Sequence, residues 1–416
     1  MRLRGFILAM LAMAVGLLAA QAPAQAGAER VQALFRQWLE RDLWPDARRK
    51  GISRQVFTAA FRDARVNLRL PDLVLPGQKA RIPRHQRQAE FRSPGRYFRE
   101  SSLKALAARG RRLLARHKGL LARIEARFGV PGRIVLAIWG RETSFGRVKL
   151  RYNAFSILGT HAFLSRRKAF FRPQLIDALV IVQRGLASVA QMKSSWGGAL
   201  GQPQMLPGVY LKYAVDFDGD GRRNIWTSIP DILASIASHL ARHGWQRGRD
   251  WGFEVRLPAS VSCALEGPDQ GKTFARWAAL GVRRVNGRPF PQAELRKRAF
   301  LLLPAGRHGP AFLATRNFYV LKSYNKSDLY ALFIGHLADR IQWGDRRFAA
   351  PWGKVGGMYR SDVATLQRAL ERQGFDVGGA DGLPGFKTRR SIGAWQKAHG
   401  LRDSCFPEKS LLGRIR

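Results

Sequence analysis

Acidic residues are scarce in this sequence. Its 416 residues include 72 Lys and Arg but only 29 Asp and Glu, which gives a formal net charge of +43. Such an excess favours a polyanionic partner, namely a nucleic acid, an anionic membrane surface or an acidic polymer. Because the basic residues are scattered, Arg-rich usage that follows genomic base composition is the alternative explanation. Basic stretches interleaved with aromatic residues are lacking, which argues against a nucleic-acid partner.

Long apolar runs are lacking after the N-terminus. The one long run, Phe6–Ala20, follows Arg2 and Arg4 and precedes the small-residue site Ala24-Gln25-Ala26. This pattern predicts a secretory signal peptide over residues 1–26, with an apolar core too short for a confident membrane span. No cysteine follows the run, so a lipid anchor is not supported. We expect a mature chain with no integral membrane span.

Cysteine is nearly absent, since Cys263 and Cys405 are the only two. A secreted chain enters a compartment that permits disulfides, so the two could pair across domains. Two free, buried thiols are the alternative.

The length allows two or three domains, and 46% hydrophobic residues exclude a wholly disordered chain. Helical periodicity dominates residues 27–348, with patterns around 31–43, 54–64, 101–128, 165–188, 230–243 and 317–340. Short β-like runs among Gly and Pro predict a small α+β insertion at about 251–311. Pro351-Trp352-Gly353 marks a boundary before a compact domain over 353–416. The predicted fold is mainly α.

The most informative stretch is Val130–Gly146, with the sequence VPGRIVLAIWGRETSFG. Pro131 suits the start of a helix, and the face that contains Val135, Ile138 and Trp139 ends in an acid, Glu142. A carboxyl group at the mouth of an apolar stripe should be partly desolvated. Desolvation raises its pKa, as a general acid near neutral pH requires. A surface Glu paired with the neighbouring Arg is the plainer interpretation.

Two further stretches carry side chains that can bind sugars. The glycine-broken run Ser194–Pro207 lets the backbone approach a ligand, and Tyr324–Ser327 with Tyr330 forms the start of a helix, where a cap is the ordinary interpretation. The candidate ligand-binding residues, whose side chains can hydrogen-bond hydroxyls and amides, are Ser195, Gln202, Gln204, Tyr324, Asn325, Ser327 and Tyr330.

The stretch DFDGDG is similar to the start of a calcium loop. Asp216, Asp218 and Asp220 stand at positions 1, 3 and 5, and a glycine follows at position 6. Position 12 is Thr227 rather than Glu, and Asp231 could complete the set of ligands. The alternative is an Asp-Gly turn without metal.

Taken together, these motifs resemble the lytic transglycosylase B family (glycoside hydrolase family 103 type), bacterial enzymes that cleave peptidoglycan glycan strands. The resemblance extends to about Asp345 and is carried by GVPGRIVLAIWGRETSFG, LGQPQMLPGVYLKYAVDFDGDGRRNIW and NFYVLKSYNKSDLYA. Gln88-Ala89-Glu90-Phe91 departs from the family, which usually has Pro second, and His239 stands where Tyr is frequent.

The resemblance implies a lysozyme-like helical catalytic core with Glu142 as the sole acid and base. It also implies a glycan cleft lined by Ser195, Gln204, Tyr324, Asn325 and Tyr330, and calcium at the aspartate loop. No organic cofactor is expected.

Residues 353–416 resemble the peptidoglycan-binding domain of type 1. Two amphipathic helices joined by a Gly/Asp loop would enclose a small core of Leu366, Leu370, Ile392 and Trp395; a generic small helical domain is the alternative. The matching residues are Val363, Leu366, Gln367, Leu370, Gly374, Phe375, Asp381, Gly382, Gly385, Thr388, Ile392, Trp395, Gln396, Gly400 and Leu401.

A second catalytic carboxylate is also lacking. Ordinary glycoside hydrolysis needs two, whereas one acid suffices if a substrate hydroxyl attacks the anomeric carbon. The family resemblance therefore implies cleavage between N-acetylmuramic acid and N-acetylglucosamine that leaves 1,6-anhydromuramic acid ends. A lysozyme-type hydrolase and a non-catalytic wall-binding protein are the alternatives. We expect a periplasmic monomer that acts on peptidoglycan strands.

Overall fold

The computed structural model describes residues 27–79, 93–355 and 357–415. These residues form two compact units, one from 27–79 and 148–228 (unit 1) and one from 93–147, 229–355 and 357–415 (unit 2). The predicted signal peptide and the Gln88–Phe91 motif lie outside the described residues. Within the described part, no helix combines the length and the apolar character needed to cross a membrane.

Unit 1 is helical, apart from one short antiparallel strand pair that joins Tyr152–Asn153 (β1) to Lys193–Ser194 (β2). Residues 27–38 are helical and lead into the π-helical turn Leu39–Leu43 (η1). The other helices are Trp44–Arg49 (α2), Arg54–Phe61 (α3), Ala154–Leu164 (α8), Lys168–Gln183 (α9), Val189–Gln191 (η3) and Pro207–Tyr213 (α10).

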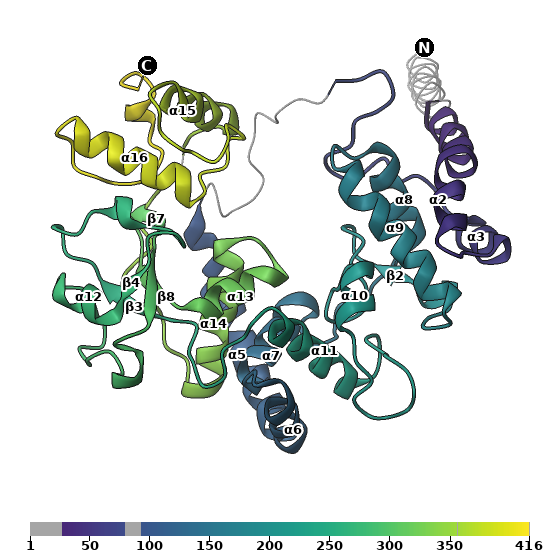
Figure 1. Cartoon of the computed structure of the whole chain (residues 1–416), viewed down its shortest axis with the longest axis horizontal. Coiled ribbons are helices and arrows are strands. Elements are labelled where there is room, and N and C mark those ends of the chain that lie inside the picture. The colour runs from purple at the N-terminus through teal and green to yellow at the C-terminus, as the bar shows by residue number, and fades with distance from the viewer. Residues whose placement is uncertain (1–26, 80–92, 356, 416) are drawn as a thin grey trace, which may run out of the picture. The chain divides into compact units, whose positions relative to one another are not determined.

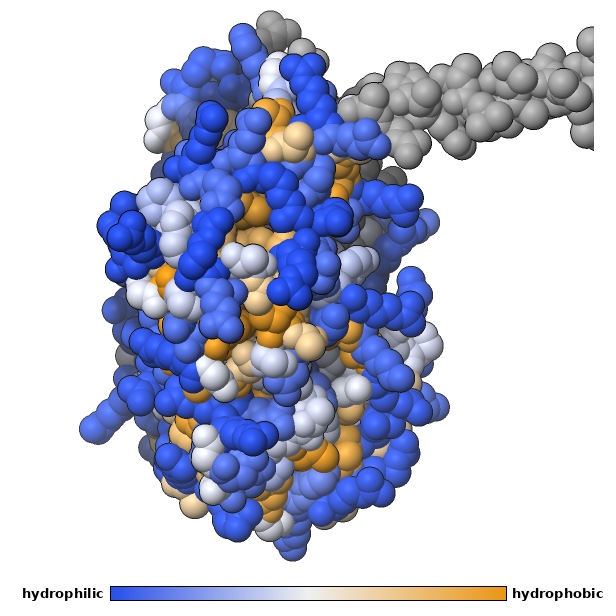
Figure 2. All heavy atoms as spheres, turned by 90° about the vertical axis from the view of Figure 1, so that its right-hand side faces the viewer, coloured by the Kyte–Doolittle hydropathy of each residue, from blue (hydrophilic) through white to orange (hydrophobic). Residues whose placement is uncertain are grey.

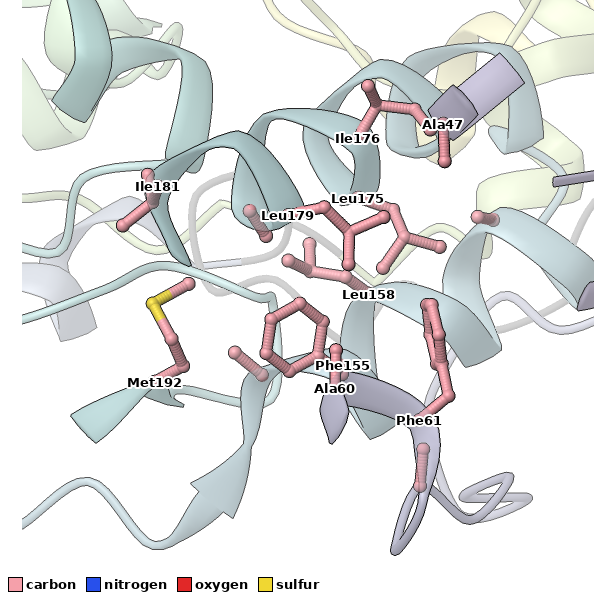
Figure 3. Close-up of a cluster of buried hydrophobic side chains, with 14 of the residues drawn as sticks. Ala47, Ala60, Phe61, Phe155, Leu158, Leu175, Ile176, Leu179, Ile181 and Met192 are labelled. Carbon is pink, nitrogen blue, oxygen red and sulfur yellow. The ribbon is translucent and has the colours of Figure 1, made fainter. Parts of the chain in front are cut away.

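Helices α8 and α9 pack along each other and supply the centre of the unit 1 core. Figure 3 shows Phe155 and Leu158 of α8 directed toward Leu175 and Leu179 of α9, with Phe61 at the side. All five side chains are at most 3% exposed. Burial of apolar side chains on this scale stabilises the unit and holds the loops that follow α9.

Unit 2 contains a helical core, a sheet and a helical C-terminal domain (Figure 1). The core consists of Pro94–Phe98 (η2), Glu100–Arg116 (α5), Lys118–Phe128 (α6), Gly132–Thr143 (α7), Ile229–Arg242 (α11), Arg316–Tyr324 (α13) and Asp328–Trp343 (α14). Helix α7 is apolar on nearly every side from Ile134 to Trp139, and all of these residues are buried. A helix that is apolar all round belongs in a core, and α7 accordingly packs against α5, α6, α11 and α14.

The sheet inserted between α11 and α13 has five antiparallel strands in the order β4-β6-β8-β3-β5. The insertion that contains this sheet consists of Gly252–Arg256 (β3), Cys263–Leu265 (η4), Lys272–Thr273 (β4), Phe274–Ala279 (α12), Arg283–Arg284 (β5), Gln292–Glu294 (η5), Arg298–Leu302 (β6), Pro304–Arg307 (β7) and Ala311–Ala314 (β8), and β7 is not one of the five paired strands.

The C-terminal domain pairs Arg360–Arg372 (α15) with Phe386–Ala398 (α16) and ends in Lys409–Leu411 (η6). The four predicted core residues, Leu366, Leu370, Ile392 and Trp395, are all buried in one cluster. Helix α16 packs against η4, and a disulfide joins Cys263 to Cys405. Gly393 of α16 is required there because a Cβ atom would lie 2.0 Å from the Cys405 sulfur.

The predicted mainly helical fold, with a small α+β insertion and a helical C-terminal domain, is confirmed. The helix predicted over 317–340 is in fact two helices, α13 and α14. Asn325 and Ser327 separate them, because their side-chain oxygens accept backbone N–H groups at the break. Similarly, the helix predicted over 101–128 divides into α5 and α6 at His117.

Polar and charged side chains dominate the face of the molecule that Figure 2 shows. Figure 2 shows one face on which hydrophilic residues predominate and hydrophobic residues form smaller patches between them. This agrees with the large excess of Lys and Arg in the sequence.

Candidate active site

Glu142 lies in the last turn of α7 and is half-buried. The helix ends abruptly after it, because Ser144 and Phe145 both adopt left-handed backbone conformations, with φ of 50° and 58°. The reversal brings the Phe145 ring back against α7, edge-on to the ring of Trp139 at 5.6 Å between centroids. The acid is therefore held on a buried helix whose end is packed by aromatic rings.

The space beside Gly140, two residues before the acid, is filled by an aromatic ring. A Cβ atom at Gly140 would lie 2.6 Å from the tip of the Phe145 ring. The glycine thus permits the close approach of Phe145.

The carboxyl group of Glu142 accepts a hydrogen bond from a tyrosine of α14. The Tyr330 hydroxyl donates a hydrogen bond to Glu142 Oε1 at 2.5 Å. Burial raises the pKa of Glu142 from its ordinary value of 4.5 to about 7, while the Tyr330 hydrogen bond and the charge of Arg141 act in the opposite direction. A carboxyl with this pKa is protonated in a large fraction of molecules at neutral pH, which suits a general acid.

The Arg141 side chain does not form an ion pair with Glu142 among the described residues. Its guanidinium lies over the rings of Tyr97 and Phe333, at 4.5 and 4.7 Å from their centroids. No Asp or Glu of the described residues acts on the pKa of Glu142.

Tyr330 and Tyr324 flank the turn between α13 and α14. Their rings are parallel, with 6.4 Å between centroids, and His239 packs edge-on against Tyr324 at 4.9 Å. Burial raises the pKa of both phenols well above the ordinary value. Burial also lowers the pKa of His239 to about 3, with its neighbour His243 contributing. All three groups are uncharged at neutral pH.

The two remaining candidates of this turn hold its backbone. The side chain of Asn325 accepts the Ser327 N–H at 3.0 Å, and the Ser327 hydroxyl accepts the Tyr330 N–H at 3.1 Å. Ser327 is thus the N-cap of α14. Asn325 is exposed at the edge of the turn.

Ser195, Gln202 and Gln204 lie in unit 1, in the loop between β2 and α10. All three are half-buried. The amide of Gln202 donates to the Trp226 carbonyl at 2.7 Å, and that of Gln204 donates to the Gly201 carbonyl at 2.9 Å. These bonds shape the loop, and Trp196 next to it is 58% exposed.

The aspartate loop of unit 1 brings three carboxylates together. Oxygen atoms of Asp216, Asp218 and Asp220 lie within 4.8 Å of one another. Asp216 accepts two backbone N–H groups, and the Ser228 hydroxyl donates to Asp218 at 2.6 Å. Carboxylate oxygens at this spacing are suitable ligands for Ca²⁺. The fourth candidate, Asp231, is buried in the first turn of α11 in unit 2.

Sequence reasoning missed Asp328, the charged residue beside the Ser327 cap. Its carboxylate binds Lys322 and Arg389, which lie on α13 and α16. An acid in the first turn of a helix is usually a partner of the helix dipole, so the local pattern carries no signal of these distant contacts.

The chain matches two protein families. Residues 34–339 match the family described as Transglycosylase SLT domain, and residues 359–404 match a peptidoglycan binding domain. Among solved structures, SltB3 from Pseudomonas aeruginosa in complex with NAG-anhNAM-pentapeptide is 37% identical, with a TM-score of 0.79 over 92% of this chain and 99% of that chain.

Two further relatives are more distant. Membrane-bound lytic murein transglycosylase B of Escherichia coli (strain K12) is 29% identical over 51% of this chain and 58% of its own length, so the chain spans little more than half of this curated relative. The structure of Escherichia coli Slt35 in complex with calcium is 24% identical, with a TM-score of 0.57 over 76% of this chain and 92% of that chain. This last likeness concerns the fold alone.

The family match covers most of the chain and contains Glu142 together with the turn between α13 and α14. It confirms the resemblance carried by the sequence motifs. The chain belongs to the Transglycosylase SLT domain family.

Proposed function

We propose that this protein is a lytic transglycosylase that cleaves the β-1,4 bond between N-acetylmuramic acid and N-acetylglucosamine in peptidoglycan. The observation that carries the proposal is the setting of Glu142, in a chain of this family. It is a half-buried acid with a pKa of about 7, and it receives a hydrogen bond from Tyr330. The complex of the similar SltB3 with NAG-anhNAM-pentapeptide supports the same reaction.

The mechanism uses one residue twice. Protonated Glu142 gives its proton to the glycosidic oxygen, and the bond from that oxygen to the anomeric carbon of muramic acid breaks. The C6 hydroxyl oxygen of the same muramic acid then bonds to the anomeric carbon and closes a 1,6-anhydro ring. Glu142, now a carboxylate, removes the proton of that hydroxyl and returns to its starting state. No water is consumed, so no second carboxylate is needed to activate one.

Tyr330 contributes by fixing which oxygen of the acid is used. Because its hydroxyl donates to Oε1, the proton of Glu142 is carried by the other oxygen, Oε2. Because the carboxyl group is held in one orientation, its proton on Oε2 is directed toward the glycosidic oxygen that receives it. The residues that we propose as contacts of the glycan are Tyr324, Asn325, Ser327 and Tyr330 of unit 2, and Ser195, Gln202 and Gln204 of unit 1.

The product test is mass spectrometry of fragments released from purified peptidoglycan. The mature protein is expected to release muropeptides that end in 1,6-anhydromuramic acid, which sodium borohydride does not reduce. Reducing muramic acid ends would instead establish a lysozyme-type hydrolase. Binding to peptidoglycan without release of fragments would leave a non-catalytic wall-binding protein.

We propose that the enzyme acts in the periplasm as a monomer. The basic surface would favour association with an anionic wall polymer. The disulfide between Cys263 and Cys405 fits an oxidising compartment, and the sequence pattern of residues 1–26 fits a secreted precursor.

We also propose that Asp216, Asp218 and Asp220, with Asp231, bind Ca²⁺. Addition of 10 mM CaCl2 is expected to raise the melting temperature, because an ion that binds the folded state alone at a millimolar site stabilises it by about 1–2 kcal/mol. Differential scanning calorimetry checks the shift, and EDTA should reverse it.

The Asp218→Asn variant is expected to lose this response, whereas Asp63→Asn, an exposed change elsewhere in unit 1, should keep it. An equal Ca²⁺ response in both variants would show that the loop is not the site.

A further inference from the structure

An arginine of the C-terminal domain is buried against the rest of unit 2. Arg389 lies on α16 and is 3% exposed. It donates two hydrogen bonds to Glu266, at 2.9 and 2.6 Å, and a third to Asp328 at 3.1 Å. Glu266 follows η4 and is fully buried. The Arg389 guanidinium thus joins the C-terminal domain both to the sheet insertion, at Glu266, and to helix α14 of the helical core, at Asp328.

The second acid in this cluster, Asp328, is the first residue of α14. Lys322 of α13 donates to its other oxygen at 2.5 Å. Although burial acts in the opposite direction, Lys322 and Arg389 hold the pKa of Asp328 below its ordinary value. Asp328 is therefore a carboxylate held between two cations, one on α13 and one on α16.

Asp328 lies two residues before Tyr330, whose hydroxyl donates the hydrogen bond to the catalytic acid. Ser327, the preceding residue, caps α14 by accepting the N–H of Tyr330, and Tyr330 donates to Glu142. Any shift of the first turn of α14 would move the Tyr330 hydroxyl with it, since the helix is rigid over so short a span.

We propose that Arg389 is a positioning residue for the reaction, which fixes the first turn of α14 and thereby the Tyr330 hydroxyl on Glu142. The peptidoglycan-binding domain then takes part in building the active site in addition to binding the wall. This inference rests on the proposed function, because it concerns the rate of that reaction.

Attachment of the C-terminal domain does not require this residue. The disulfide and the ion pairs Arg307–Asp403 and Arg390–Asp269 already join that domain to the sheet insertion. Among the described residues, Arg389–Asp328 is the only ion pair between the C-terminal domain and the helices α13 and α14. A buried ion pair adds little net stability and is better suited to fixing one arrangement.

The test compares variants of the full mature chain on a soluble glycan of alternating N-acetylglucosamine and N-acetylmuramic acid. Glu266→Gln/Arg389→Met removes the buried charges together, so that neither is left unpaired. We expect kcat to fall about tenfold with little change in KM, since a small misplacement of a catalytic group is costly. The basic limb of the pH–rate profile should move to higher pH, because the Tyr330 hydrogen bond lowers the pKa of Glu142.

Three further variants separate positioning from general damage. Arg390→Ala removes the neighbouring ion pair and should leave kcat and the pH profile unchanged. Asp328→Asn keeps the Glu266–Arg389 pair and should reproduce the loss, and this variant decides the question if the double variant does not fold. In a Tyr330→Phe background, the Glu266→Gln/Arg389→Met substitutions should change kcat and the pH profile very little further, because both changes act through the Tyr330 hydroxyl.

Unchanged kcat and pH profile in folded Asp328→Asn would overturn the inference, as would effects that simply add to those of Tyr330→Phe. A wild-type protein that releases no anhydromuramic ends would instead overturn the proposed function. The two failures are therefore distinguishable.

Discussion

Glu142→Gln is expected to lower the rate of glycan cleavage by about three orders of magnitude. Glutamine has nearly the same shape, and its carbonyl oxygen can still accept the hydrogen bond from Tyr330. It has no acidic proton to give to the leaving oxygen and cannot remove one from the attacking hydroxyl. A general acid or base contributes about 10²–10⁴-fold, and here one residue serves both steps. Release of anhydromuropeptides, quantified by mass spectrometry, measures the loss.

The same variant should be more stable than the wild type at alkaline pH. Glu142 has a pKa of about 7 in the folded chain against an ordinary value of 4.5. Between these values the folded state binds more protons than the unfolded state, so stability falls as the pH rises. Ionising this partly buried group costs about 2 kcal/mol after allowance for solvent screening. Gln avoids this cost, so its advantage in melting temperature should be present at pH 8 and disappear near pH 4.

Glu125→Gln is the matched control, since it makes the same change at an exposed position on α6. It should leave both activity and the pH dependence of melting unchanged. Substantial activity in Glu142→Gln, with the same anhydro products, would mean that another group supplies the proton.

The position of the acid could be predicted from the sequence because it depends on local pattern. Val135, Ile138 and Trp139 are buried on α7 as their spacing predicted, and Glu142 follows on the same helix. The partner of the acid could not be predicted in the same way. Tyr330 was predicted only as a contact of the glycan, and its hydrogen bond to Glu142 joins residues that are 188 positions apart in sequence.

Contacts between distant parts of the chain account for the rest of what the sequence left open. The two cysteines allowed a disulfide or two free thiols, and the structure forms the disulfide. Nothing in the local sequence around Arg389 distinguishes it from Arg390, yet the first is buried against Asp328 and the second pairs with an exposed Asp269. The docking of α16 on η4 makes this difference, and it is a property of the tertiary fold.

Removal of the disulfide is expected to cause the largest loss of stability. Cys263 and Cys405 are both fully buried and are separated by 142 residues. A cross-link that closes so long a loop restricts the unfolded chain strongly, and loss of a native disulfide typically costs about 2–5 kcal/mol. We therefore expect Cys263→Ala/Cys405→Ala to lower the melting temperature of unit 2 by about 6–12 °C in scanning calorimetry.

The reduced wild type should melt like this variant, and reductant should have no effect on the variant itself. Val261→Ala, which removes apolar volume from the same buried cluster but keeps the cross-link, separates packing loss from chain restriction. Its melting temperature should fall less and should respond to reductant. If the reduced wild type melted at the temperature of the oxidised protein, the docking of α16 on η4 would depend on packing and on the ion pairs of Arg389, Arg390 and Arg307. The disulfide would then add nothing to the contacts that hold the C-terminal domain against the sheet.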